Sequence, residues 1–247
     1  MQFLNKVAIV TGGSTGIGKS TVELLIDRGA IVYNIDINTP DSNNSHFIHC
    51  DITDYEKLQK VINDIYFKEK KIDALFSNAG MHLVSNIEQT SLEELDKIIS
   101  VNIKGTFYTL KTVIPLMKEH RQGNILLMGS DQSFVGKGLS AAYGLTKGAI
   151  AQLTKSTAID YAEFNIKINC ICPGTIDTPL LEKAKRSFMS ATGLSDKEVM
   201  NMLEEAQPIK RIARPDEIAK LACYLLSDDN SFMTGSLVPI DGGYTCQ

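Results

Sequence analysis

The chain has 247 residues, 43% of them hydrophobic, and a formal net charge of −4 at pH 7. This composition suits one α/β domain with a sizeable core, and the negative charge argues against a nucleic-acid-binding protein. No apolar run is long enough to cross a bilayer and no signal-peptide pattern precedes the first predicted strand, so we expect a cytoplasmic protein with no membrane partner.

Short apolar runs alternate with amphipathic, helix-like stretches along the whole chain, without a linker or a repeat. The runs predict strands near residues 7–11, 31–36, 46–50, 73–77, 125–130, 167–172 and 236–240. This alternation is typical of an α/β fold with a doubly wound, seven-stranded parallel sheet and helices on both faces. We therefore predict a single domain over residues 1–247, with ligands at the carboxyl ends of the strands.

A glycine-rich turn follows the first predicted strand and precedes a helix-like stretch. This arrangement presents backbone N–H groups and a helix N-terminus to a pyrophosphate, and glycine lets the phosphate approach the backbone. The spacing is Gly-x-x-x-Gly-x-Gly, which differs from the Gly-x-Gly-x-x-Gly fingerprint. The alternative is a glycine turn without a ligand. The predicted dinucleotide-binding residues of the turn are Gly12, Ser14, Thr15, Gly16, Ile17 and Gly18.

Asp36 ends the second predicted strand, eighteen residues after Gly18. An acid at about this distance holds the adenosine ribose hydroxyls of NAD, and its charge repels the extra phosphate of NADP. Ile37 and Asn38, which follow it, offer no cation for that phosphate. We therefore predict NAD as the cofactor, preferred over NADP. The alternative is a loop acid that caps the next element.

Tyr143 and Lys147 stand four residues apart in a helix-like stretch, so they share one helix face. Ser130 ends the apolar run of the fifth predicted strand. A free tyrosine titrates near ~10, and a neighbouring cation lowers such a pKa. We expect Lys147 to lower the pKa of Tyr143, so that the phenolate can accept the proton of an alcohol. Taken alone, Tyr-x-x-x-Lys is an ordinary helix-surface pattern.

The chain resembles the short-chain dehydrogenase/reductase family over nearly its whole length, because the family's motifs occur in order at family spacing. The matching segments are Thr11-Gly12-x-x-x-Gly16-Ile17-Gly18, Asp51-Ile52, Ser77-Asn78-Ala79-Gly80, Asn102 in Val-Asn-Ile-Lys-Gly, Ser130 with Tyr143-x-x-x-Lys147, Pro173-Gly174-Thr175-Ile176-Asp177-Thr178, Arg214-Pro215-Asp216-Glu217 and Asp241-Gly242-Gly243. The resemblance implies a Rossmann fold, an NAD(P)-dependent oxidoreductase and a homotetramer that packs through the helices near 103–119 and 142–162.

The same resemblance implies roles for individual residues. The implied catalytic tetrad is Asn102, Ser130, Tyr143 and Lys147, in which Asn102 would hold a water that links Lys147 to solvent. Lys147 would also hold the nicotinamide ribose. The implied cofactor contacts further along the chain are Asp51 and Ile52 at the adenine, Asn78, Ala79 and Gly80 after the fourth strand, and Pro173, Gly174, Ile176 and Thr178 at the nicotinamide. Ser77 replaces an asparagine of the family motif, so we expect altered local hydrogen bonding without loss of activity.

The substrate pocket is predicted from residues between Ser130 and Tyr143, which usually line it in this family. Gln132 could bind a hydroxyl group, and Lys137 could pair with a carboxylate or point to solvent. His82 could face the pocket or lie in a surface loop. Residues 180–211 are predicted to form a short helical lid that seals hydride transfer from water, with a static pair of surface helices as the alternative. The five cysteines lack metal-site spacing, so no metal is predicted.

The predicted reaction interconverts a small polar secondary alcohol (a hydroxy acid, polyol or sugar) and its ketone. Tyr143 would take the hydroxyl proton, and Ser130 would donate to the substrate oxygen, where negative charge develops. One alternative is a 3-oxoacyl thioester reductase, although Asp36 disfavours its usual NADPH and no basic cluster suggests an acyl-carrier partner. The other alternative is an NAD(H)-binding regulator without turnover, against which the intact tetrad argues.

Overall fold

The computed structural model describes residues 2–42 and 45–247, which contain one parallel sheet of seven strands. The strands are β1 (Val7–Thr11), β2 (Ile31–Asp36), β3 (His46–His49), β4 (Ala74–Ser77), β5 (Gly123–Met128), β6 (Ile166–Pro173) and β7 (Leu237–Ile240). All the predicted strands are confirmed, and no bound differs from its prediction by more than two residues.

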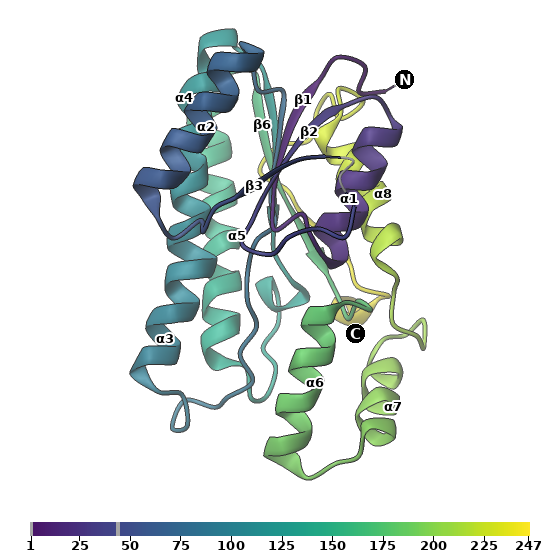
Figure 1. Ribbon diagram of the computed structural model, residues 1–247. Helices are drawn as coiled ribbons and strands as arrows, with labels where there is room; N and C mark the ends of the chain where they lie inside the picture. The colour runs from purple at the N-terminus through teal and green to yellow at the C-terminus, as the bar shows by residue number, and fades with distance from the viewer. Residues whose placement is uncertain (1, 43–44) are drawn as a thin grey trace.

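Helices cover both faces of the sheet, as the alternation of patterns predicted (Figure 1). They are α1 (Gly16–Asp27), α2 (Tyr55–Glu69), α3 (Leu92–Ile99), α4 (Thr106–His120), α5 (Ala141–Tyr161), α6 (Pro179–Thr192), α7 (Asp196–Ala206) and α8 (Pro215–Leu226). Helices α1 and α8 pack together on one face, and α2, α4 and α5 cover the other. In the part of the chain that the structure describes, no helix is both long and apolar enough to span a bilayer.

The strand order is β3-β2-β1-β4-β5-β6-β7, which is the doubly wound order of a Rossmann fold. From β1 the chain first adds strands on one side, β2 and β3, and then returns to add β4 and the later strands on the other side. Thr11 at the end of β1 pairs with Ser77 at the end of β4. The glycine-rich turn and the Asn78 segment therefore leave the sheet side by side, at the point where such folds bind dinucleotides.

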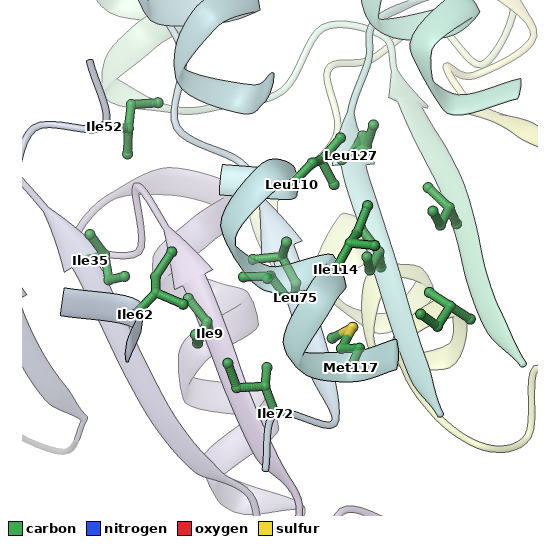
Figure 2. Close-up of a cluster of buried hydrophobic side chains, with 14 of the residues drawn as sticks. Ile9, Ile35, Ile52, Ile62, Ile72, Leu75, Leu110, Ile114, Met117 and Leu127 are labelled. Atoms are coloured by element: carbon green, nitrogen blue, oxygen red, sulfur yellow. The ribbon is translucent and has the colours of Figure 1, made fainter. Parts of the chain in front are cut away.

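The core lies on both faces of the sheet because its central strands are apolar on both sides. Every residue of β1 and β4 is buried, which is the pattern expected of parallel strands between two helical layers. Figure 2 shows one layer, where β-branched and leucine side chains of the strands meet α2 and α4. The labelled members on these four strands and two helices are Ile9, Ile35, Leu75, Leu127, Ile62, Leu110, Ile114 and Met117.

The predicted lid segment, residues 180–211, forms α6 and α7 beyond the edge of the sheet (Figure 1). Thr178 caps α6, since its Oγ1 accepts from the backbone N–H of Leu181 at 3.2 Å, and Pro179 follows at the first helical position. Gly193, with φ of +75°, ends α6 in the left-handed conformation. Ser195 and Glu198 form a capping box at the start of α7. The two helices thus have ends defined by local sequence.

Candidate active site

A cleft of about 1030 Å³ is lined by the segments that follow β1, β2, β4, β5 and β6, and by α6 and α7. Every residue predicted from the sequence to bind cofactor or substrate lines this cleft except Ser14. Of the four predicted catalytic residues, Ser130, Tyr143 and Lys147 line it and Asn102 lies behind its wall. The structure therefore brings together residues from positions 12 to 178 at one edge of the sheet.

The glycine-rich turn has no room for side chains at two positions. Gly12 has φ of +67°, and a Cβ atom on it would lie 2.8 Å from the Cα atom of Ala79. A Cβ atom on Gly18 would overlap the carbonyl oxygen of Gly12. Asn78 holds the turn, since its Nδ2 donates to the carbonyl oxygens of Thr11 at 3.1 Å and Gly12 at 2.9 Å. This bare backbone before the N-terminus of α1 fits a pyrophosphate.

Asp36 is buried at the end of β2, where two backbone N–H groups hold its carboxylate. Ser14 N donates to Oδ2 and Asn38 N donates to Oδ1, each at 2.9 Å. Asn38 Nδ2 also donates to Oδ1, at 3.3 Å. Oδ2 keeps a lone pair for a further donor, and the residue lines the cleft, so the carboxylate fits a ribose hydroxyl. The side chain of Ser14 points away from the cleft, because its Oγ donates to the carbonyl oxygen of Asn38 at 2.6 Å. Ser14 thus shapes the loop through its backbone.

Tyr143 and Lys147 lie on one face of α5 and are both buried, with 9% and 5% of their surface exposed. The Lys147 Nζ donates to the carbonyl oxygen of Met128, at the end of β5, at 2.7 Å. It lies 5.5 Å from the centroid of the Tyr143 ring. Loss of hydration lowers the pKa of Lys147 to about 8, because burial disfavours the charged ammonium.

The pKa of Tyr143 requires a correction to the sequence-based expectation. Burial raises this pKa above its ordinary value, while the hydroxyl of Ser130 acts in the opposite direction and the charge of Asp131 adds to the increase. The expectation of a Tyr143 pKa below its ordinary value is therefore wrong for this geometry. The desolvation of the phenol outweighs the ammonium, which is directed at the Met128 carbonyl.

Asn102 lies in a π-helical segment, Ser100–Gly105, that joins α3 to α4. Its Oδ1 accepts from Met81 N at 2.8 Å, and its Nδ2 donates to Met81 O at 2.9 Å and to Thr146 Oγ1 at 3.0 Å. The side chain therefore ties the loop after β4 to α5, one residue before Lys147. Departures from α-helical geometry of this kind are frequent at functional sites.

The imidazole of His82 lies against the phenol of Tyr143. The His82 ring packs on the Tyr143 ring with centroids 4.3 Å apart. Burial, and then the charges of Lys137 and Lys147, lower the pKa of His82 to about 4, so its imidazole is neutral at pH 7. Among the described residues, three buried polar atoms around this wall have no hydrogen-bond partner: His82 Nδ1, Gln132 Oε1 and Ser140 Oγ.

Lys137 lines the cleft and pairs with a carboxylate of the protein itself. Its Nζ forms an ion pair with Asp131 Oδ2 at 2.6 Å and lies 4.2 Å from the ring centroid of Tyr244. The Asp131 side chain is only 4% exposed, and its Oδ1 accepts from Ser130 Oγ at 2.8 Å. The ammonium is therefore engaged by a buried carboxylate of the protein, while the Lys137 side chain stays 28% exposed.

Sequence reasoning missed Tyr244 as a part of this wall, and it included Asp131 only as one of the residues between Ser130 and Tyr143 that line the pocket. The position of Asp131, directly after Ser130 and six residues before Lys137, was a usable signal. Tyr244 carried no signal, since it reaches the cleft from a turn at the C-terminal end of the chain. At Ser77, the buried Oγ has no hydrogen-bond partner among the described residues.

The chain is similar to known dehydrogenases over almost its full length. A family model described as Enoyl-(Acyl carrier protein) reductase matches residues 12–245. The cyclopentanol dehydrogenase of Comamonas sp. (strain NCIMB 9872) is 33% identical over 98% of this chain and 97% of its own. The D-beta-hydroxybutyrate dehydrogenase of Rhizobium meliloti is 31% identical, over 99% of this chain and 100% of its own. The structure of Thermoplasma acidophilum aldohexose dehydrogenase matches with a TM-score of 0.92 and 34% identity, over 99% of this chain and 95% of that one.

Proposed function

This chain belongs to the short-chain dehydrogenase/reductase family, and from that premise we propose that it interconverts a small polar secondary alcohol and its ketone with NAD. Family membership makes it an oxidoreductase that acts on CH–OH groups with a nicotinamide dinucleotide. The observation that carries the proposal is the meeting of Ser130, Tyr143 and Lys147 in the cleft that also contains the bare glycine turn.

When bound, the dinucleotide supplies the acceptor for the hydride of the alcohol carbon. The backbone of the turn from Gly12 to Gly18 would hold its pyrophosphate, and Asp36 would accept from its adenosine ribose. Asp51 and Ile52, which line the cleft, would contact the adenine, and the segment from Pro173 to Thr178 would contact the nicotinamide.

The protein residues handle the proton of the alcohol. Tyr143, as phenolate, accepts the hydroxyl proton, and the Lys147 ammonium stabilises that phenolate. Ser130 donates to the substrate oxygen, for which its hydroxyl must turn away from Asp131 Oδ1, its present acceptor at 2.8 Å. Asn102 positions α5 through Thr146. The reverse reaction uses the same groups, with Tyr143 as the proton donor.

The substrate class is supported by the relatives, whose names span a cyclic alcohol, a hydroxy acid and a sugar. A second candidate is a 3-oxoacyl thioester reductase, which the description of the matched family model favours. The carboxylate of Asp36 argues against it, because NADPH would bring a phosphate to that charge. The two reactions are separated by measuring the rate of turnover with secondary alcohols and with 3-oxoacyl thioesters, each with NAD(H) and with NADP(H).

The proposal also includes a lid, a homotetramer and a cytoplasmic location. Helices α6 and α7 place Leu181, Phe188 and Met202 along the cleft, which suits a lid over the substrate. Exposed apolar side chains on α4 and α5 support a tetramer: Phe107, Leu145 and Ile159. Other apolar residues of the same helices are buried in the core of the monomer and do not contribute to a tetramer interface: Leu110, Ile114, Met117 and Ala158.

We expect Asp36→Asn to shift cofactor preference towards NADP by at least about tenfold. Repulsion between a carboxylate and a phosphate at contact distance is worth ~1 to 4 kcal/mol, and the substitution removes it while keeping the side-chain shape. The measurement is kcat/KM for each cofactor at a saturating alcohol concentration. Asp27→Asn, at the exposed end of α1, is the control and should leave the ratio unchanged. A wild-type enzyme that uses NADP better than NAD would contradict the assignment.

A further inference from the structure

We propose that the cleft wall beside Ser130 selects a neutral polyhydroxy alcohol, a diol or sugar, over a hydroxy acid, through the Asp131–Lys137 ion pair. The inference rests on the proposed function and narrows its substrate class. The wall consists of Asp131, Gln132, Lys137 and His82, all of which line the cleft next to Tyr143 or Ser130. We call these four residues the polar wall.

The charge of the polar wall disfavours a carboxylate substrate. Lys137 is its cation, and Asp131 neutralises that cation at 2.6 Å. His82 is neutral at pH 7, since burial and the two nearby lysines lower its pKa to about 4. A substrate carboxylate at this wall would therefore meet an engaged ammonium and a buried carboxylate of its own sign.

The other lysines along the cleft do not replace Lys137. Lys147 is directed at the Met128 carbonyl, and Lys185 pairs with Glu182 and Asp196, each at 2.9 Å. Lys97 and Lys183 lie on the exposed surfaces of α3 and α6. These two keep their hydration and hold a carboxylate only weakly.

The hydrogen-bonding capacity of the polar wall matches hydroxyl groups. Asp131 uses one lone pair on each oxygen, for Ser130 and for Lys137, and has others to spare. Lys137 keeps two N–H groups beyond its bond to Asp131. Gln132 Oε1 and His82 Nδ1 are buried without a partner among the described residues. A hydroxyl both donates and accepts, so it can donate to Asp131 or Gln132 Oε1 and accept from Lys137. A carboxylate only accepts, so it leaves the acceptors unmatched.

The position of the pair relative to Ser130 places the second hydroxyl close to the reacting carbon. Ser130 Oγ is 2.8 Å from Asp131 Oδ1, and Ser130 is the proposed donor to the reacting oxygen. A hydroxyl on a carbon adjacent to the reacting one, or one carbon further, can therefore reach the ion pair. The inference thus specifies 1,2-diols, 1,3-diols and sugars.

The test uses two matched pairs of substrates that share the reacting secondary alcohol. They are 1,2-propanediol against lactate, and 1,3-butanediol against 3-hydroxybutyrate, with kcat/KM measured for both enantiomers at saturating NAD. The wild-type enzyme should favour the diol of each pair by about tenfold or more. Asp131→Asn frees the Lys137 ammonium and removes the like charge, so the diol-to-acid ratio should fall at least tenfold. Asp160→Asn, at the exposed end of α5, should leave the ratio unchanged.

A wild-type preference for the hydroxy acids, or an Asp131→Asn ratio equal to that of the wild type, would overturn the inference. If no alcohol is oxidised with either cofactor, the proposed function fails separately. The preference is then decided by calorimetry of the same matched pairs on protein saturated with NADH. Tighter binding of the diols supports the polar wall as a hydroxyl site. Tighter binding of the acids, or no binding of either, refutes it.

Discussion

Tyr143→Phe is expected to lower kcat for alcohol oxidation at least about a thousandfold, while cofactor affinity stays within a few-fold of the wild type. Proton transfer to a positioned side chain is worth typically 10²- to 10⁴-fold, and this substitution removes the only atom proposed to accept the proton. The ring is buried and packs on His82, so phenylalanine fills the same volume and should keep the fold. Steady-state kinetics give kcat, and a fluorescence titration with NADH gives the cofactor dissociation constant.

The matched control is Tyr161→Phe, which removes a phenol from the other end of the same helix. It should leave kcat within about twofold, because Tyr161 does not line the cleft. If Tyr143→Phe retained wild-type turnover, the proton would be taken by another group and the proposed mechanism would be wrong. A loss of turnover accompanied by loss of NADH binding would assign Tyr143 a role in holding the cofactor instead.

Lys147→Met is expected to lower kcat/KM at pH 7 at least about a hundredfold. It is also expected to remove the rising limb of the pH profile, the increase of kcat/KM with pH near pH 8. The pKa of Lys147 is lowered to about 8 while that of Tyr143 is raised, so the two groups titrate as a pair. Below pH 8 both groups keep their protons and no acceptor is available. Above pH 8 the pair has lost one proton. One form of this singly deprotonated pair has Tyr143 as a phenolate beside the Lys147 ammonium, and this form can accept the proton of the alcohol. Wild-type oxidation should therefore rise as pH rises through about 8.

Without the ammonium, the phenol must ionise alone, and burial holds its pKa above the ordinary value. The rising limb of Lys147→Met should consequently move to higher pH, out of the range of the wild-type limb. The measurement is kcat/KM for oxidation from pH 6 to pH 10 in both proteins. Lys155→Met, exposed on the same helix, is the control and should keep the wild-type profile. A limb near pH 8 that survives in Lys147→Met would belong to another group.

The sequence was sufficient to predict the seven strands, because their buried apolar runs are local signals with glycine, proline or charged residues at their ends. It also predicted which residues meet in the cleft, because parallel strands bring their carboxyl ends to one edge of the sheet. Both kinds of inference depend on spacing along the chain. They therefore place Gly12, Asp36 and Ser130 together without any knowledge of side-chain direction.

The pKa values and the pairing of side chains could not be predicted in this way. The pKa of Tyr143 depends on how much water α5 and the neighbouring loops exclude, which no local pattern reports. The direction of Lys137 depends on Asp131 and on Tyr244, which comes from the far end of the chain. The side chain of Ser14 points inward because of Asn34 and Asn38 on the next strand and its loop. In each case a contact between distant segments decides the outcome.

The central claim is that the enzyme moves a hydride from an alcohol carbon while Tyr143 takes the hydroxyl proton. The most direct measurement uses a secondary alcohol with deuterium on the reacting carbon, followed by mass spectrometry of the reduced cofactor. The account predicts one deuterium in the NADH formed by the wild-type enzyme, and almost no NADH from Tyr143→Phe under the same conditions. Reduced cofactor without deuterium, or equal amounts of it from the two proteins, would contradict the claim.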